Sequence, residues 1–211
     1  MKKLLTKYIA CLLSLLMTFL GFAGCGQNTK EAESVVQAYF TAVFALNLDA
    51  MEVCLSEGTN KDMGVDTSFF ERDYAQSDIY KKSVESMFKT LSNTILYTID
   101  GSVAKEDGKA AVSVTVSHTD VNKTAVDEVI QTKINEYVQQ HPEVLEKTEA
   151  DQNDINIQLM ANAYNKFVKL QPKVSKTFDV ILQKIDGQWK ILNGPENKEL
   201  KALFQEIYET Y

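Results

Sequence analysis

The sequence has few of the residues that bind metals or cross-link small domains. Its 211 residues include three cysteines, Cys11, Cys25 and Cys54, and two histidines. A disulfide framework or a zinc cluster needs several such residues at regular spacing. His118 and His141 have no partner at helical ligand spacing. We therefore expect no disulfide, no metal and no cofactor, and a fold stabilised by packing.

The sequence also lacks an excess of positive charge, because its net charge is −7. A nucleic-acid-binding surface needs clustered Lys and Arg to neutralise phosphates, so we expect no nucleic-acid partner. The same balance disfavours electrostatic adhesion to anionic lipid. No glycine-rich phosphate loop and no catalytic-serine motif is present.

Long hydrophobic runs are missing except at the start of the chain. Lys2, Lys3 and Lys7 precede an apolar run over residues 8–22. A positive start followed by an apolar stretch is typical of a bacterial export signal. Removing the three leader lysines from the count gives −10 for the mature chain. The mature length suits one domain.

The end of this run indicates how the chain is anchored. Phe22-Ala23-Gly24-Cys25 resembles the lipobox of bacterial lipoproteins, with Phe22 in place of the usual Leu, Val or Ile. The resemblance implies that residues 1–24 are a lipoprotein signal peptide and that the Cys25 sulfur carries a diacylglycerol. The protein would then lie on the extracytoplasmic face of the cell membrane, lipid-anchored. A plain transmembrane anchor, or a secreted protein with Cys25 in a disulfide, are the alternatives.

Apolar residues at helical spacing predict three helices in the first half of the chain. The first follows a capping pair, Asn28 and Glu31, and the second follows a similar pair, Asp49 and Glu52. Gly58 is placed to end the second helix in a left-handed conformation. The third helix begins at Ser77 and continues to about residue 91.

The period then changes to two, which predicts strands. Two runs, 94–104 and 109–119, are joined at Asp107-Gly108, and a later pair is joined at Asp186-Gly187. Both dipeptides are strong hairpin signals, because the turn needs positive φ.

Residues 121–171 interrupt the strands with two further apolar stripes at helical spacing. We interpret them as an inserted helical hairpin that packs on the domain, or alternatively as a partner-binding arm. A last helix follows Pro195, which suits a first helical turn.

This order of elements resembles the cystatin-like or nuclear transport factor-like superfamily, and in particular lipoproteins of Gram-positive bacteria whose function is uncharacterised. The matching segments are AYFTAV, IDGQWKIL and NKELKALF, within residues 30–120 and 174–211. The resemblance implies an α+β fold, with N-terminal helices packed on a curved antiparallel sheet that encloses a cone. Ligands of such proteins often lie at the mouth of the cone, where Tyr39 and Trp189 could line a cavity. Both are also ordinary core aromatics.

The predicted organisation is therefore a tether over residues 25–30 and a single α+β domain over residues 31–211. The helical insertion at residues 121–171 belongs to that domain.

Three residues are candidates for acid, base or nucleophile chemistry. Cys54 supplies a thiol, but its apolar neighbours favour an inert core position. Asp179 alternates with Phe178 and Val180, which places it on the solvent face of a strand. Tyr97 is the other candidate, and a structural role is the simpler interpretation for it.

Metal ligation is weakly indicated by two clusters. His118-Thr119-Asp120 falls at a strand end, and Glu149, Asp151 and Asp154 fall in a polar stretch that we interpret as a loop. A calcium loop also needs a sharp glycine turn, which is missing here. We therefore expect a solvated loop.

The sequence thus favours a lipid-anchored extracytoplasmic binding or interaction lipoprotein without evident catalytic activity. Its partners would be the membrane, through diacylglycerol on Cys25, and a small hydrophobic ligand or a protein. The alternative is a small enzyme with a single acid or base in a cone-shaped pocket. A solute-capturing lipoprotein of a transporter usually needs two lobes, for which this chain is short.

Overall fold

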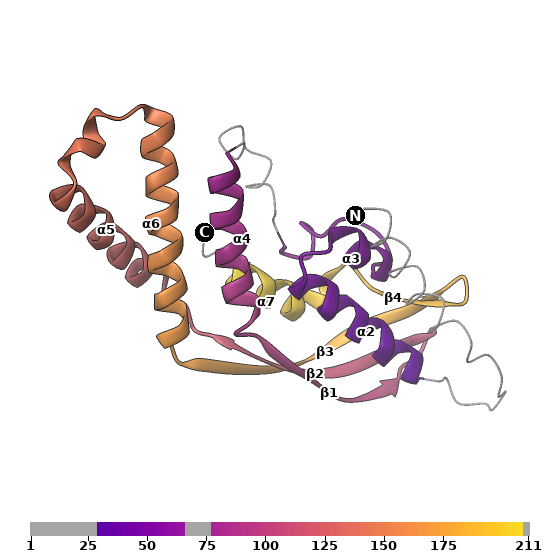
Figure 1. Ribbon diagram of the computed structural model, residues 1–211. Helices are drawn as coiled ribbons and strands as arrows, with labels where there is room; N and C mark the ends of the chain where they lie inside the picture. The colour runs from indigo at the N-terminus through magenta and orange to yellow at the C-terminus, as the bar shows by residue number, and fades with distance from the viewer. Residues whose placement is uncertain (1–28, 66–76, 209–211) are drawn as a thin grey trace.

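An open antiparallel sheet with helices on one face organises the protein, and a helical hairpin extends beyond one end of it (Figure 1). The computed structural model describes residues 29–65 and 77–208. The predicted leader, the predicted lipid-attachment residue Cys25 and the Asn28 cap lie outside these residues. No helix of the described segments is long and apolar enough to span a bilayer.

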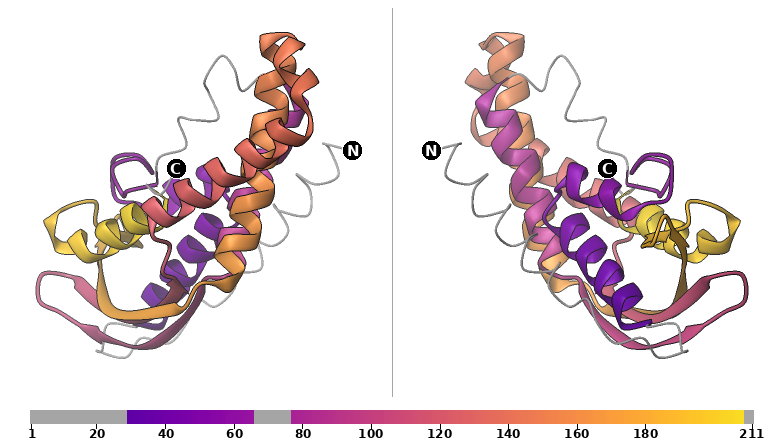
Figure 2. Two further views of the ribbon diagram at one scale, coloured as in Figure 1. Left: turned by 90° about the vertical axis from the view of Figure 1, so that its left-hand side faces the viewer. Right: turned by 90° about the vertical axis from the view of Figure 1, so that its right-hand side faces the viewer.

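The elements follow the predicted order. The helices are α2 (Thr29–Phe44), α3 (Leu48–Cys54), α4 (Asp78–Ser92), α5 (Lys123–Gln140), α6 (Glu149–Leu170) and α7 (Lys198–Tyr208), with short 3-10 helices η3 (Pro142–Glu146) and η4 (Pro195–Asn197). The strands are β1 (Leu96–Ala104), β2 (Lys109–Thr119), β3 (Lys173–Ile185) and β4 (Gln188–Ile191), in the spatial order β1-β2-β3-β4. The sheet curves beneath the helices (Figure 2). The α+β prediction, with helices packed on a curved antiparallel sheet and a helical hairpin inserted between β2 and β3, is confirmed.

Some helix boundaries differ from the predicted ones. Helix α2 begins at Thr29, inside the segment predicted as a tether. Helix α3 is capped by Asn47, whose side-chain oxygen accepts a hydrogen bond from the Ala50 N–H at 3.2 Å. The prediction of a cap at Asp49 is therefore wrong by two residues, because Asn47 supplies the capping oxygen and Asp49 lies inside the first turn. Gly58 has φ +78°, as predicted, but α3 already ends at Cys54.

The period-two pattern of β2 sets the two faces of the sheet. Val112, Val114 and Val116 have no exposed surface, and the intervening residues lie on the opposite face. Both hairpin turns have positive φ at the two predicted residues, 57° and 68° at Asp107-Gly108 and 49° and 81° at Asp186-Gly187. Positive φ at both positions is what a two-residue turn of this kind requires, so the hairpin predictions are confirmed.

Aromatic rings fill the space between the helices and the sheet. The Phe40 ring of α2 stacks on Tyr97 of β1 at a centroid distance of 5.0 Å and contacts Phe204 of α7 at 5.8 Å. Tyr39 contacts the same Phe204 ring from the side at 6.0 Å. Tyr39, Phe40 and Phe204 are all fully buried. Because close-packed interiors leave few voids, this region is core.

A buried asparagine joins η4 to the edge of β3. Asn197 is 1% exposed, and its side-chain oxygen accepts from the Ile181 N–H at 2.8 Å. Its amide group donates to the carbonyls of Ile181, at 2.8 Å, and Leu192, at 2.7 Å. The side chain thus continues the hydrogen bonding of β3 where β4 has ended.

Replacing Asn197 by Ala should destabilise the protein by about 2–3 kcal/mol, because it leaves buried backbone groups without partners. Urea unfolding at neutral pH measures the loss. The control is Asn193→Ala, which removes a side chain that makes one hydrogen bond, to the Glu57 carbonyl. Equal losses for the two variants would contradict this account of Asn197.

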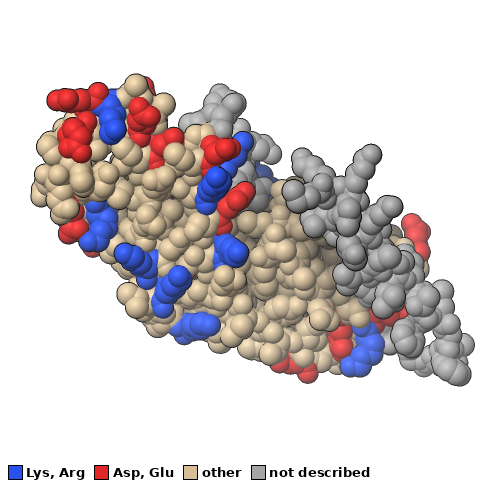
Figure 3. All heavy atoms as spheres, viewed as in Figure 1, with Lys and Arg blue, Asp and Glu red and all other residues tan. Residues whose placement is uncertain are grey.

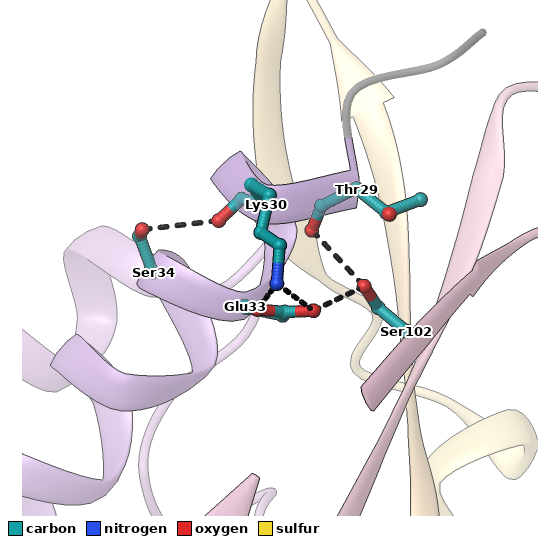
Figure 4. A network of polar contacts seen from close by, with 5 residues as sticks. All are labelled: Thr29, Lys30, Glu33, Ser34 and Ser102. Atoms are coloured by element: carbon teal, nitrogen blue, oxygen red, sulfur yellow. Dashed lines mark hydrogen bonds and ion pairs between the residues drawn. The ribbon is translucent and has the colours of Figure 1, made fainter. Parts of the chain in front are cut away.

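A polar network fixes the start of α2 on β1 (Figure 4). The Ser102 hydroxyl donates to the Glu33 carboxylate at 2.5 Å and lies 3.5 Å from the Thr29 carbonyl. Lys30 contacts the same carboxylate at 3.1 Å. The hydrogen bond from Ser102 lowers the pKa of Glu33 below its ordinary value of 4.5, and Lys30 lowers it further against the opposing effect of burial.

This network should make part of the stability depend on pH. A carboxyl with a lowered pKa in the folded state stabilises the fold above its unfolded pKa, and the contribution is lost as the pH falls through the folded pKa. Ser102→Ala should therefore cost about 1 kcal/mol at pH 7, and the cost should shrink below about pH 4.5. Urea unfolding from pH 3 to 7 tests this. The control Ser113→Ala should show no such dependence, and a cost that stays constant down to pH 3 would refute the role of Glu33.

Candidate functional site

The inserted hairpin is attached to the rest of the protein along one side of α6. Helix α6 lies beside α4, while α5 lies on its other side (Figures 1 and 2). The Ser77 hydroxyl at the start of α4 donates to Asp154 at 2.5 Å, and the Asn165 amide donates to Ser86 at 2.8 Å. These contacts attach α6, and with it the hairpin, to α4.

Helix α6 carries two apolar stripes. The first consists of buried residues, Ile157, Ala161, Tyr164 and Val168. The second consists of Leu159, Ala163, Phe167 and Leu170, of which Leu170 is 83% exposed. Successive residues are 100° apart, so the stripes, two residues out of step, face nearly opposite directions. The first stripe is buried throughout. The second is buried at Ala163, half-buried at Leu159 and Phe167, and exposed at Leu170.

The second stripe forms one wall of a groove of about 600 Å³ between α5 and α6. The groove is lined by Val129, Lys133, Leu159, Asn162, Ala163, Lys166, Phe167 and Leu170. The apolar periodicity of the sequence indicates Val129, Leu159, Ala163 and Phe167 as helical stripe residues. It misses the polar residues and Leu170. Leu170 is found by continuing the second stripe at spacings of three and four, whereas the apolar pattern carries no signal for the polar residues.

The charged side chains of the groove are both lysines. Lys133 pairs with Glu136 at 2.6 Å on the same helix. Among the described residues, no ion pair joins Lys166 to a carboxylate. Figure 3 shows acidic side chains gathered at the tip of the hairpin and basic side chains nearer its base. The groove therefore combines apolar walls with a positive rim.

A second hollow, of about 430 Å³, runs along the outer face of β3 beside η4. Most of its lining residues are polar. The lining consists of Ser113, Thr177, Phe178, Asp179, Ile181, Glu196, Lys198 and Glu199. Its acidic residues do not converge, and the described segments contain no group of three or more residues that could hold a metal ion. Asp179 is exposed here, on the solvent face, as its alternation with Phe178 and Val180 predicts.

The aromatic residues considered for a cone lie in the core. Tyr39 has no exposed surface and Trp189 is 4% exposed, and neither lines either of the two hollows. In the described structure the Tyr39 hydroxyl and the Trp189 indole N–H have no hydrogen-bond partner, and burial raises the pKa of Tyr39. Tyr97 is half-buried, with its hydroxyl 3.4 Å from the Gln37 carbonyl. Both tyrosines are therefore structural: Tyr39 is buried in the core, and Tyr97 packs against α2.

Cys54 is the free thiol of the described chain and is 8% exposed. Its sulfur lies 3.4 Å from the Ala50 carbonyl, within the same helix. Burial raises the pKa of the thiol, and the nearby Lys190 opposes this only in part. Since the thiolate is the reactive form, Cys54 is an inert core residue, as its apolar neighbours predict.

The first candidate metal cluster is structural. His118 is 2% exposed, with Nδ1 3.1 Å from the Thr119 carbonyl and Nε2 3.7 Å from Glu206. Asp120 is exposed. His141, the other histidine, caps the end of α5 and contacts the Tyr137 ring at 4.5 Å.

The second cluster is not a loop, so that prediction was wrong. Glu149, Asp151 and Asp154 lie in the first two turns of α6. Thr148 caps the helix, accepting from the Asp151 N–H at 3.2 Å and donating to the Asp151 carboxylate at 2.7 Å. The sequence signal was Thr148-x-x-Asp151, a capping pattern. Acidic residues at this position also complement the helix dipole.

Comparison with known proteins shows a likeness of fold. No family model matches the sequence, and no curated protein matches it. The structure is similar to the crystal structure of a candidate lipoprotein, ycdA, from Bacillus subtilis, with 16% sequence identity and a TM-score of 0.52. The match covers 86% of this chain and 56% of the Bacillus chain. The fold is therefore one that occurs in a bacterial lipoprotein-like protein, of whose chain the match spans little more than half.

The inertness of Cys54 can be measured on the chain from Gly26 onward, in which it is the remaining cysteine. We expect its reaction with a disulfide reagent at pH 8 to be about a hundredfold slower in the native protein than in urea, because burial suppresses the thiolate. Native and urea-unfolded rates that agree within a factor of about three would contradict this.

Proposed function

We propose that the protein is a lipid-anchored module on the extracytoplasmic face of the cell membrane, which binds its partner through the groove between α5 and α6. The observation that carries the proposal is the groove itself. Its apolar walls are half-buried at Val129, Leu159 and Phe167, and its Leu170 is 83% exposed. An exposed apolar hollow of this kind is the usual form of a ligand site.

Two observations support the anchor. Residues 22–25 resemble a lipobox after a positively charged apolar leader, and the Bacillus protein with a similar fold is itself reported as a candidate lipoprotein. The signal peptide of residues 1–24 and the diacylglycerol on Cys25 are parts of this proposal. Two long acyl chains bind a bilayer far more stably than one.

The packing of the core supports placing the partner at the hairpin. We assign the domain to the cystatin-like class on its element order, which would put a ligand at the mouth of a cone. In this chain that region holds Tyr39, Phe40 and Phe204, all fully buried. The groove of the inserted hairpin would thus bind the ligand in place of the cone.

The alternative of a small enzyme would need an acid or base aimed into a closed pocket. The candidates among the described residues do not meet this condition. Asp179 is exposed on the outer face of the sheet, and the Tyr97 hydroxyl lies against the backbone of α2. We therefore propose binding and not catalysis.

Replacing Cys25 by Ala should abolish lipid labelling and release the protein from membranes or leave it as an uncleaved precursor. Metabolic labelling with a fatty acid, membrane fractionation and intact mass measure the result. The matched control is Cys11→Ala, because Cys11 lies in the leader and should be absent from the mature protein. Unchanged labelling of the Cys25 variant would contradict the proposed anchor.

A further inference from the structure

Resting on the proposed function, we propose that the groove between α5 and α6 binds a single-chain amphiphile with an anionic head group, of the long-chain fatty acid type. The chain would lie on the apolar wall, and the carboxylate would pair with the lysines at the rim. The two halves of this proposal rest on separate features of the groove.

The apolar half rests on the second stripe of α6. Leu159, Ala163, Phe167 and Leu170 follow one another along the helix, and Val129 of α5 faces them across the groove. From Leu159 to Leu170 the wall is about 16 Å long at 1.5 Å per residue, which suits an extended alkyl chain of about 12 carbons. The volume of about 600 Å³ lies in the usual range for small-molecule sites.

The anionic half rests on the charges of the rim. Lys133 and Lys166 are the charged residues of the lining, and no carboxylate lines the groove. This is notable in a chain of net charge −7. Lys133 already pairs with Glu136, so Lys166 is the cation available to a ligand. A neutral or cationic amphiphile would leave this charge unmatched.

The position of the hairpin favours a free amphiphile over a membrane surface. Ser102 fixes the start of α2 near the β1–β2 turn, and the hairpin leaves the sheet at the opposite ends of β2 and β3 (Figure 1). The eleven residues of β2 span about 35 Å. Cys25 precedes α2 by only three intervening residues, or about 10 Å of chain. An anchor at Cys25 therefore attaches to the end of the sheet that is far from the groove.

Calorimetric titration of the chain from Gly26 onward with dodecanoate, below its micelle concentration, tests the proposal. This chain contains every described element but no lipid of its own to compete. We expect one site per chain. Methyl dodecanoate and dodecyltrimethylammonium should bind about tenfold more weakly, because neither can pair with Lys166.

Two pairs of variants locate the site. Leu170→Asp should weaken dodecanoate binding at least about tenfold, because it places a like charge on the apolar wall. Leu145→Asp is its control, since Leu145 is also exposed, at 65%, on the same hairpin but outside the groove. Lys166→Gln should weaken binding about fivefold, and Lys169→Gln, on the same helix but outside the lining, should not. Leu170, Lys166 and both control residues are exposed, so each variant should fold, which thermal unfolding checks.

Several results would overturn the proposal. Equal affinity for dodecanoate and its methyl ester would remove the role of the lysines. Binding to anionic vesicles but not to monomeric dodecanoate would make the groove a membrane-contact face. A concentration-dependent dimer that Leu170→Asp abolishes, without dodecanoate binding, would make it a contact between two copies. Failure of the anchor is distinguishable, because a protein without lipid on Cys25 that still binds dodecanoate refutes the anchor alone.

Discussion

The complete burial of one face of β2 is the constraint on which the architecture depends. Val112, Val114 and Val116 have no exposed surface, and β2 pairs along its length with both β1 and β3. A shift of one residue would expose this face to water and bury its serines and threonine. The register therefore fixes where β1 meets α2 at one end of the sheet and where the helical hairpin leaves it at the other.

Much of the fold could be predicted from local patterns in the sequence. Alternation in β2 and the dipeptides Asp107-Gly108 and Asp186-Gly187 determine strands and turns through nearest neighbours alone, so those predictions hold. The start of α6 is harder to predict, because a polar stretch without apolar periodicity is typical of a loop as well as of a capped helix start. The helix starts there because a threonine and an aspartate three residues apart can cap each other's backbone and side chain.

The candidate site could be predicted only in part, for a physical reason. Periodicity shows that Leu159 and Phe167 belong to an apolar stripe, but it cannot tell which of the two stripes of α6 finds a partner in the core. That depends on α4, which is distant in sequence and packs against one side. The same holds for Lys166, because periodicity does not show that no carboxylate lines the groove beside it. The resemblance makes Tyr39 and Trp189 candidates for lining a cavity. In the structure both side chains are buried in the hydrophobic core.

The closure of the sheet beneath the insertion has an evolutionary consequence. The last residues of β2 pair with the first of β3, His118 with Val174 and Thr119 with Lys173, and the Asp120 N–H donates to the Pro172 carbonyl at 2.9 Å. The two ends of the insertion are thus clamped together by the sheet, as the two ends of a short hairpin loop would be. Segments of different length and composition can be exchanged at this point while the strands keep their pairing. Evolution can therefore replace this one segment without disturbing the sheet, provided that the new segment still covers α4.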